Sequence, residues 1–354
     1  MNCLDVCYKK IGQNPVYLNV YPPCLGSQPP CPRLPVVLYF HGGGLTVGNR
    51  TSWFPTWLKD RTVASGIVFI SADYRLLPSA TVHDIIDDIK DLFSFLNQDE
   101  LCFKTDEGRL FKADAMRIAV AGTSAGGSCA YQAAIHASPK PKAVLAMYST
   151  YGDAFTAHAL LPKHKVFFIG RELLDPQDFS EFLHPNCKSL GPISDSPLSY
   201  HPASSPTPGL PANPRMPLSR LYLQLGVVLD YATGQHEPSL SARLRPLLDA
   251  ADPFARQNAM QARIPPVHHR IFPQFNITPH FPPTFLFHGA KDSAVPVQES
   301  EHMRALLERA GVPVRLLVVE GAEHSLDFAP DAEALYGVHF DEMAEFLRTL
   351  LKDD

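Results

Sequence analysis

Short apolar segments that alternate with amphipathic helical segments most constrain the fold of this chain. Two apolar segments, residues 35–40 and 66–71, precede a helical segment at 82–96 whose apolar residues recur at three- and four-residue spacing. Two more, residues 117–121 and 143–148, flank an alanine-rich helical segment. Strands that are apolar throughout are typical of parallel sheets covered by helices. The pattern predicts an α/β fold with a mostly parallel central sheet and helices on both faces.

The alternation stops in the middle of the chain and resumes near the C-terminus. Residues 152–283 do not alternate, residues 185–217 hold nine prolines, and residues 221–231 look helical. A long segment of this kind inside a domain is usually a lid or a binding segment. The pattern predicts three units, which are an α/β catalytic domain at 35–151 and 284–354, a partly irregular Pro-rich cap insertion at 152–283, and an N-terminal segment at 1–34 in the cap or at the edge of the sheet.

Composition excludes several classes of function. The 354 residues carry a formal net charge of −5, whereas a nucleic-acid-binding chain would need a clustered basic surface. No apolar run approaches the ~18 residues of a membrane span, and the N-terminus lacks a secretion signal, so a cytoplasmic protein is expected. The seven cysteines are scattered without metal-like spacing, so we expect reduced thiols and no metal site.

A serine lies in a Gly-rich turn where a predicted strand meets a predicted helix. Residues 122–126 read Gly-Thr-Ser-Ala-Gly and match the pattern G-x-S-x-G. The glycines leave room for a crowded backbone, and the N–H groups of the following helix stabilise negative charge near the hydroxyl of Ser124. A phosphate-binding turn is the alternative, but its Gly-Lys-Ser/Thr ending is absent. We therefore predict that Ser124 is a nucleophile.

Three glycines follow another predicted strand, in the segment His41-Gly42-Gly43-Gly44. Glycines let a loop pass close to a ligand and turn its backbone N–H groups toward it. Such groups stabilise the oxyanion of a tetrahedral intermediate, and loss of one donor typically costs ~10²–10³ in rate. A flexible turn is the alternative. Because both Gly-rich motifs directly follow predicted strands, we favour an oxyanion hole.

A nucleophilic serine needs a base, and the base needs an acid that fixes its tautomer. His324 follows the last predicted strand and Asp292 follows the strand before it, so both are predicted beside Ser124 at the carboxyl edge of the sheet. Asp327 is the competing acid, but it follows no strand. The competing bases lie in the insertion or within helices and are better explained as surface or packing residues; they are His268, His269, His280, His302 and His339.

These segments together resemble the α/β-hydrolase superfamily, in its hormone-sensitive-lipase-like carboxylesterase branch (α/β-hydrolase fold-3). The resemblance extends from about Val36 to the C-terminus, except for the insertion. The segments that carry it are His41 to Gly44, Asp73 to Leu76, Gly122 to Gly127, His288 to Asp292, and His324. Their combination is highly specific for the α/β-hydrolase fold and its catalytic triad.

The resemblance assigns a role to each candidate residue. It implies a triad of Ser124 as nucleophile, His324 as base and Asp292 as orienting acid. It implies oxyanion donors at the amides of Gly42, Gly43 and Ala125, with Gly44 as the alternate.

Two positions depart from the family's pattern. Thr123 stands where the family has Asp or Glu, and Leu77-Pro78-Ser79 stands where it has Ala-Pro-Glu. Neither change removes a catalytic group, and both leave the substrate open.

The leading functional prediction is a serine esterase that cleaves carboxylic esters of a small or medium substrate through an acyl-enzyme. No metal or organic cofactor is implied, and the partner is a small acyl substrate, with no nucleic acid and no membrane span. One alternative is a thioester or lactone hydrolase that acts on a metabolic or polyketide intermediate. Another is a receptor without activity, since some plant hormone receptors use this fold after losing the histidine. The presence of His324 argues against the receptor, and Ser124 argues against a lyase with threonine in its place.

Overall fold

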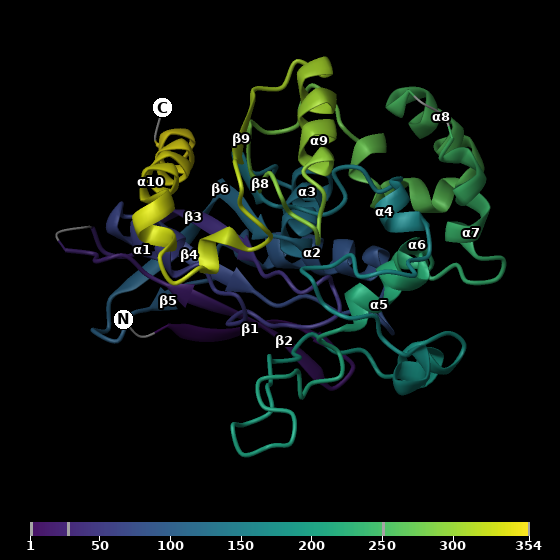
Figure 1. The fold of residues 1–354 in the computed structure, drawn as a ribbon. Coiled ribbons are helices and arrows are strands. Elements are labelled where there is room, and N and C mark those ends of the chain that lie inside the picture. Colours follow the sequence, from purple (N-terminus) through teal and green to yellow (C-terminus); the bar gives the residue numbers. More distant parts are fainter. Residues whose placement is uncertain (1–2, 27–28, 250–251, 353–354) are drawn as a thin grey trace.

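A nine-stranded mixed β-sheet forms the centre of the computed structural model, which describes residues 3–26, 29–249 and 252–352 (Figure 1). The strand order is β1-β2-β4-β3-β6-β7-β8-β9, and β5 pairs with β6. The strands are β1 (Leu4–Ile11), β2 (Asn14–Tyr21), β3 (Arg33–Phe40), β4 (Val68–Ala72), β5 (Phe103–Lys104), β6 (Leu110–Thr123), β7 (Ala143–Met147), β8 (Thr284–Gly289) and β9 (Val314–Val319). The predicted α/β class with a mostly parallel sheet is confirmed.

Parallel pairing brings the functional ends of the strands to one edge of the sheet. All pairings from β4 through β3, β6, β7 and β8 to β9 are parallel, so their carboxyl ends lie together. The N-terminal strands β1 and β2 extend the sheet beyond β4, and both pair in antiparallel fashion. The sequence analysis did not identify these two strands, because β1 is an outer strand whose residues are mostly only partly buried.

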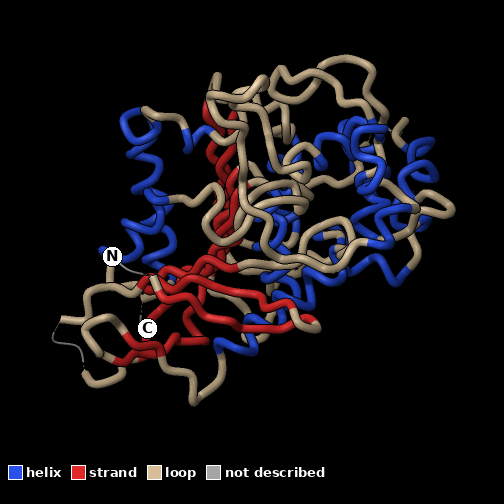
Figure 2. Tube along the Cα trace, turned by 90° about the horizontal axis from the view of Figure 1, so that it is seen from below, coloured by secondary structure: helices blue, strands red, loops and turns tan. Residues whose placement is uncertain are grey.

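Helices cover both faces of the sheet (Figure 2). One face packs against α1 (Thr56–Ala64) and α10 (Ala332–Leu350), and the other packs against α2 (Val82–Leu96), α3 (Ala125–His136) and α9 (Gln298–Arg309). Successive residues of β3 alternate between the two cores, with Leu38 on the α2 side and Tyr39 on the α10 side. Every position of such a strand faces a core, which explains why these strands are apolar throughout.

The insertion between β7 and β8 contains short helices that lie beside the sheet (Figure 1). The α-helices are α4 (Ala157–Leu160), α5 (Leu218–Leu225), α6 (Val228–Thr233), α7 (Leu240–Leu244) and α8 (Pro253–Arg263), and the 3₁₀ helices are Pro176–Phe182, Asn186–Ser189, Arg245–Leu247, Pro266–Ile271 and Pro273–Phe275. A further 3₁₀ helix, Leu326–Phe328, follows β9.

The prediction that residues 221–231 are helical is confirmed except at residues 226–227, where the chain breaks between α5 and α6. Gly226 ends α5 with a φ of 64°, and a Cβ at this position would lie 2.5 Å from the carbonyl oxygen of Leu160. Only glycine combines this left-handed backbone with such a close approach. The apolar periodicity of the sequence therefore continues through this turn, although the backbone at Gly226 is not helical.

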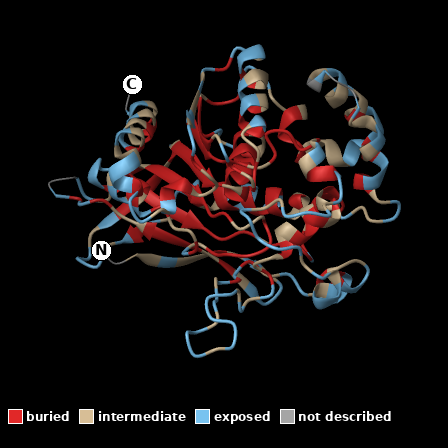
Figure 3. Cartoon of the chain, viewed as in Figure 1, coloured by how far each residue is buried: buried red, intermediate tan, exposed pale blue. Residues whose placement is uncertain are grey.

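The Pro-rich segment forms an exposed loop that protrudes from the molecule (Figure 3). Backbone hydrogen bonds join Ser199 to Ala212 and His201 to Leu210, and the residues between them are largely exposed. Exposed loop tips are preferred sites of proteolysis. We expect proteinase K to cut first within residues 199–212, as identified by mass spectrometry of the early fragments. First cuts within β9 would contradict this view of the loop.

Two structural observations bear on location and redox state. No helix in the described part of the chain is long and apolar enough to cross a membrane. All seven cysteines are free thiols, with the Sγ atoms of Cys31 and Cys102 3.7 Å apart.

Candidate active site

Ser124 lies at a sharp turn between β6 and α3. Its backbone adopts φ 52° and ψ −123°, a conformation that an L-residue rarely takes. A Cβ at Gly126 would lie 2.0 Å from the carbonyl oxygen of Phe40, and a Cβ at Gly122 would lie 2.1 Å from the carbonyl oxygen of Gly126. Both glycines are therefore required by the close approach of α3 to the sheet, which positions the serine hydroxyl.

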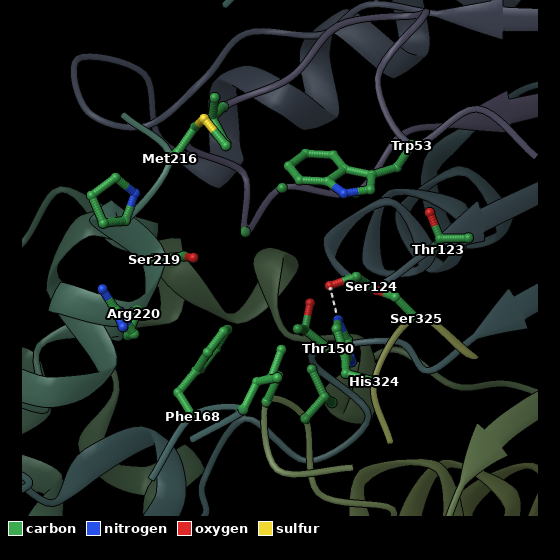
Figure 4. A pocket seen from close by; sticks show the side chains of 18 of the residues that line it. Trp53, Thr123, Ser124, Thr150, Phe168, Met216, Ser219, Arg220, His324 and Ser325 are labelled. Atoms are coloured by element: carbon green, nitrogen blue, oxygen red, sulfur yellow. Dashed lines mark hydrogen bonds between the residues drawn. The ribbon is translucent and has the colours of Figure 1, made fainter. Parts of the chain in front are cut away.

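The structure brings the three predicted triad residues together. The Nε2 atom of His324 lies 3.1 Å from Oγ of Ser124 (Figure 4). Its Nδ1 atom lies 2.6 Å from Oδ2 of Asp292. Ser124 follows β6, Asp292 follows β8 and His324 follows β9, and the parallel order β6-β7-β8-β9 places the carboxyl ends of these strands along one edge. This geometry can remove a proton from the serine hydroxyl and hold the resulting imidazolium beside a carboxylate.

Asp292 is buried and remains ionised because of its hydrogen bonds. Burial alone would raise the pKa of this carboxyl, but hydrogen bonds from His288 and His324 outweigh burial and lower the pKa to about 2. The backbone amides of Ala294 and Val295 also donate to Oδ1, at 2.9 and 2.7 Å. The carboxylate is thus fixed in position before any substrate binds.

The low pKa of Asp292 predicts a specific loss of stability in acid. Its folded-state pKa of about 2 lies below the ~3.9 of an unfolded aspartate. Ionised Asp292 therefore contributes stability that is present above about pH 4 and is lost as the pH falls toward 2, amounting to about 2 kcal/mol. Urea unfolding should show that the difference in stability between wild type and Asp292→Asn shrinks between pH 5 and pH 2. A difference that is independent of pH would contradict the assignment.

The Gly-rich loop after β3 lies directly against Ser124. A Cβ at Gly42 would lie 3.4 Å from Cβ of Ser124, while Gly43 has a φ of 106° and would place a Cβ 2.1 Å from the carbonyl oxygen of Val47. The amide of Ala125 lies at the N-terminus of α3. Within the described residues, the backbone amides of Gly42 and Gly43 have no backbone acceptor. Gly42 therefore lies against the serine, Gly43 lines the same cavity, and Ala125 directly follows the serine.

His41 supports this loop from within the protein. Its ring is fully buried, stacks on Tyr74 with ring centroids 4.4 Å apart, and contacts the carbonyl oxygen of Gly42 through Nδ1 at 2.7 Å. Tyr74 also donates a hydrogen bond from its hydroxyl to the carbonyl oxygen of His41. Burial lowers the pKa of His41 to about 4, so the ring is neutral at physiological pH.

The rejected candidates have other surroundings in the structure. His268 contacts His83, His269 contacts backbone carbonyls of its own segment, and His302 contacts Gln257. His280 is exposed in the insertion and His339 lies in α10. Asp327 accepts hydrogen bonds from Tyr148 and Trp57.

The structure reveals Glu323 as a supporting residue that the sequence analysis missed. Its carboxylate accepts hydrogen bonds from the amide and hydroxyl of Ser293 and from the amide of His324, at 2.6 to 2.8 Å. Glu323 therefore ties the loop that carries Asp292 to the loop that carries His324. Its position next to the histidine was the available signal, but nothing in the sequence distinguishes it from a solvated surface glutamate.

Thr123, one of the two departures from the family's pattern, makes a structural contact. The hydroxyl of Thr123 lies 2.6 Å from the hydroxyl of Tyr39 on the neighbouring strand β3, so its side chain links two buried strands of the sheet. Asp73 and Arg75 are structural as well. Arg50 pairs with Asp73 at 2.7 Å, and Arg75 pairs with Asp88.

A cavity of about 250 Å³ opens at the triad (Figure 4). Its walls include Trp53, Phe168, Met216 and Leu223, and the insertion supplies the wall opposite Ser124. A smaller apolar pocket of about 80 Å³ adjoins it beside Ala125 and shares the following residues with it: Gly44, Thr150, Ser219, Leu223, Ala294 and Val295. No group of three or more His, Cys, Asp or Glu side chains in the described ranges is placed to hold a metal ion.

Comparison with protein families gives two matches. Residues 37–189 match a family model described as alpha/beta hydrolase fold, and residues 255–354 match the model of the prolyl oligopeptidase family. The two matches together include Ser124, Asp292 and His324.

The similar curated proteins fall into two groups. A probable carboxylesterase from a Phoma species is 30% identical over 41% of this chain and 46% of its own length. Probable carboxylesterase 6 from Arabidopsis thaliana is 31% identical over 41% of this chain and 42% of its own length. The non-reducing polyketide synthase ausA from Aspergillus calidoustus is 28% identical over 86% of this chain but only 12% of its own length. The chain therefore spans less than half the length of these relatives.

Solved structures share the fold. A Thermogutta terrifontis esterase 2 has a TM-score of 0.56 at 16% identity, over 98% of this chain and 94% of the other. An Enterococcus faecalis protein described as an alpha/beta hydrolase superfamily protein has a TM-score of 0.59 at 15% identity, over 95% and 96% of the two chains. The predicted α/β-hydrolase fold is confirmed by these likenesses.

Proposed function

Because the chain belongs to the α/β-hydrolase superfamily, we propose that it is a serine hydrolase that cleaves carboxylic esters. Ser124 is the nucleophile, His324 the general base and Asp292 the acid that orients it. The observation that carries the proposal is the pair of contacts of His324, whose Nε2 lies 3.1 Å from the hydroxyl Oγ of Ser124 and whose Nδ1 lies 2.6 Å from Oδ2 of Asp292.

In the first half of the reaction, Oγ of Ser124 attacks the carbonyl carbon of the ester while Nε2 of His324 takes the hydroxyl proton. The carbonyl oxygen becomes an oxyanion that accepts hydrogen bonds from the amides of Gly42, Gly43 and Ala125. The intermediate collapses as the bond to the alcohol oxygen breaks, and His324 gives its proton to that oxygen. An acyl-enzyme remains on Ser124.

In the second half, a water molecule attacks the acyl carbon and His324 takes its proton. A second oxyanion forms in the same hole, the bond to Oγ breaks, and the proton returns to Ser124 as the carboxylic acid leaves. Asp292 accepts a hydrogen bond from Nδ1 of His324 throughout, which keeps Nε2 free to act as base and stabilises the imidazolium.

A thioester substrate is the second candidate, because the polyketide synthases match far more of this chain than the carboxylesterases do. The synthase from Aspergillus calidoustus aligns with 86% of the chain, against 41% for the carboxylesterase from Phoma. The same three residues would transfer the acyl group, with a thiol as the leaving group. A matched pair of substrates, an ethyl ester and an ethyl thioester of the same acid, would separate the two candidates through the ratio of their kcat/KM values.

The experiment that tests the function is hydrolysis of a chain-length series of p-nitrophenyl esters by the wild-type protein. We expect turnover, with the preferred chain length set by the cavity and the smaller apolar pocket beside Ala125. A folded protein that binds such esters without cleaving either esters or thioesters would instead act as a small-molecule receptor.

A further inference from the structure

Two arginines line the cavity that holds Ser124 and lack an acidic partner. Arg220 lies on α5, and Arg171 lies in the loop between α4 and α5. Within the described residues, neither guanidinium group makes an ion pair or a hydrogen bond, whereas Arg50, Arg61 and Arg75 are all paired with carboxylates. Unpaired arginines of this kind are unusual in a wall that also carries the reacting groups.

Arg171 and Arg220 carry the formal charge in the described lining of the cavity. Its lining in the described chain includes no Asp or Glu side chain, although the chain carries a formal net charge of −5. Arg220 is half-buried, and both burial and the neighbouring charge of Arg171 lower the pKa of its guanidinium. The half-buried charge of Arg220 and the exposed charge of Arg171 therefore lie near each other with no counter-charge in the described lining, which favours an anion between them.

Arg171 lies in a hydrogen-bonded turn and Arg220 lies on a helix, so the backbone of each arginine is anchored. Arg171 closes a tight turn in which its amide donates to the carbonyl oxygen of Phe168. The amide of Ile169 in the same turn donates to Oγ of Ser293, which Glu323 anchors. Arg220 projects from α5 on the side of the cavity opposite Ser124 (Figure 4). Apolar side chains, including Phe168 and Leu223, also line this cavity.

We propose that Arg220 and Arg171 form an anion subsite that selects substrates bearing a carboxylate or phosphate group at a distance from the ester bond. The proposal rests on the proposed function and deepens it. The planar guanidinium group of each arginine can donate paired hydrogen bonds to a carboxylate or to a phosphate. The apolar lining of the cavity can contact a hydrocarbon spacer between the ester and the anionic group. The substrate class is therefore an acidic ester or thioester, such as a half-ester of a dicarboxylic acid.

The test compares pairs of esters that differ only in charge. One pair is p-nitrophenyl hemiglutarate and the p-nitrophenyl ester in which an isopropyl group replaces the carboxylate. A second pair is 4-acetoxybenzoate and 4-isopropylphenyl acetate, which places the anion on the alcohol side. We expect wild-type kcat/KM to favour the anionic member of at least one pair by tenfold or more, and to lose this preference in high salt. A phosphonate in place of the carboxylate distinguishes a preference for phosphate.

The variant Arg220→Gln should lower kcat/KM for the preferred anionic ester by roughly 10- to 100-fold and change the neutral ester less than threefold. Arg220→Lys should retain part of the preference, and Arg171→Gln should cause a smaller loss because Arg171 is exposed. The control is Arg304→Gln, which removes the same charge from the exposed part of α9. If Arg304→Gln had the same effect as Arg220→Gln, general charge steering rather than a subsite would explain the preference.

A binding measurement keeps this inference separate from the proposed function. In the background of Ser124→Ala, calorimetry with the hemiglutarate and its neutral counterpart should show tighter binding of the anion, and Arg220→Gln should remove the difference. Equal affinity for both compounds would overturn the anion subsite even if the wild type cleaves esters. Anion preference in binding without turnover by the wild type would overturn the hydrolase and leave the subsite standing.

Discussion

Replacing Ser124 with alanine is expected to lower kcat for the best ester substrate about 10⁶-fold. This is the loss seen when the nucleophile is removed from a serine protease with the same kind of catalytic triad. The reason is that no other hydroxyl occupies the position 3.1 Å from Nε2 of His324. The residual rate would come from the oxyanion donors and from substrate binding. Steady-state kinetics on purified protein measure the loss directly.

The same variant should remain folded and should still bind substrate. Alanine keeps the Cβ atom of Ser124, and one hydroxyl at the cavity contributes little to the core. The matched control is Ser94→Ala on the exposed face of α2, where the hydroxyl bonds only to the carbonyl oxygen of Lys90. Ser94→Ala should keep full activity. A Ser124→Ala protein with more than a tenth of wild-type kcat would require a different nucleophile.

Replacing Asp292 with asparagine is expected to lower kcat by about 10⁴, as in a serine protease whose orienting acid is replaced in this way. The amide group of asparagine would donate to Nδ1 of His324, which places the histidine proton on Nε2 and blocks the base. The geometry should otherwise persist, because the substitution preserves the shape of the side chain.

Asp327→Asn is the matched control for this prediction. Asp327 is also buried and lies near His324, but its carboxylate accepts hydrogen bonds from Tyr148 at 2.6 Å and Trp57 at 3.1 Å. We expect Asp327→Asn to lower the melting temperature and to reduce kcat less than tenfold. Equal losses of kcat in the two variants would mean that the acid of the triad is misassigned.

The sequence predicts the α/β core well because its signals are local. The helix over 82–96 has the predicted bounds, since its apolar residues form one stripe that is buried against the sheet. Ser124, His324 and Asp292 could be grouped because each follows a parallel strand, and parallel strands bring their carboxyl ends to one edge.

Features set by distant contacts could not be predicted. The break at Gly226 depends on the carbonyl oxygen of Leu160, and Glu323 matters only because Ser293 lies beside it in the fold. The lack of an acidic partner for Arg220 among the described residues is likewise visible only when the surrounding side chains are placed. The sequence shows which residue types occur, whereas these roles depend on which groups come within hydrogen-bonding distance.

The most direct test of the central claim is covalent labelling of the wild-type protein with a fluorophosphonate, followed by mass spectrometry of the intact protein and of its peptides. The account predicts one adduct per chain, located on the peptide that contains Ser124, with no adduct in Ser124→Ala. Labelling of another residue, or a folded wild-type protein that stays unlabelled and does not cleave short esters, would contradict the assignment of this chain as a serine hydrolase.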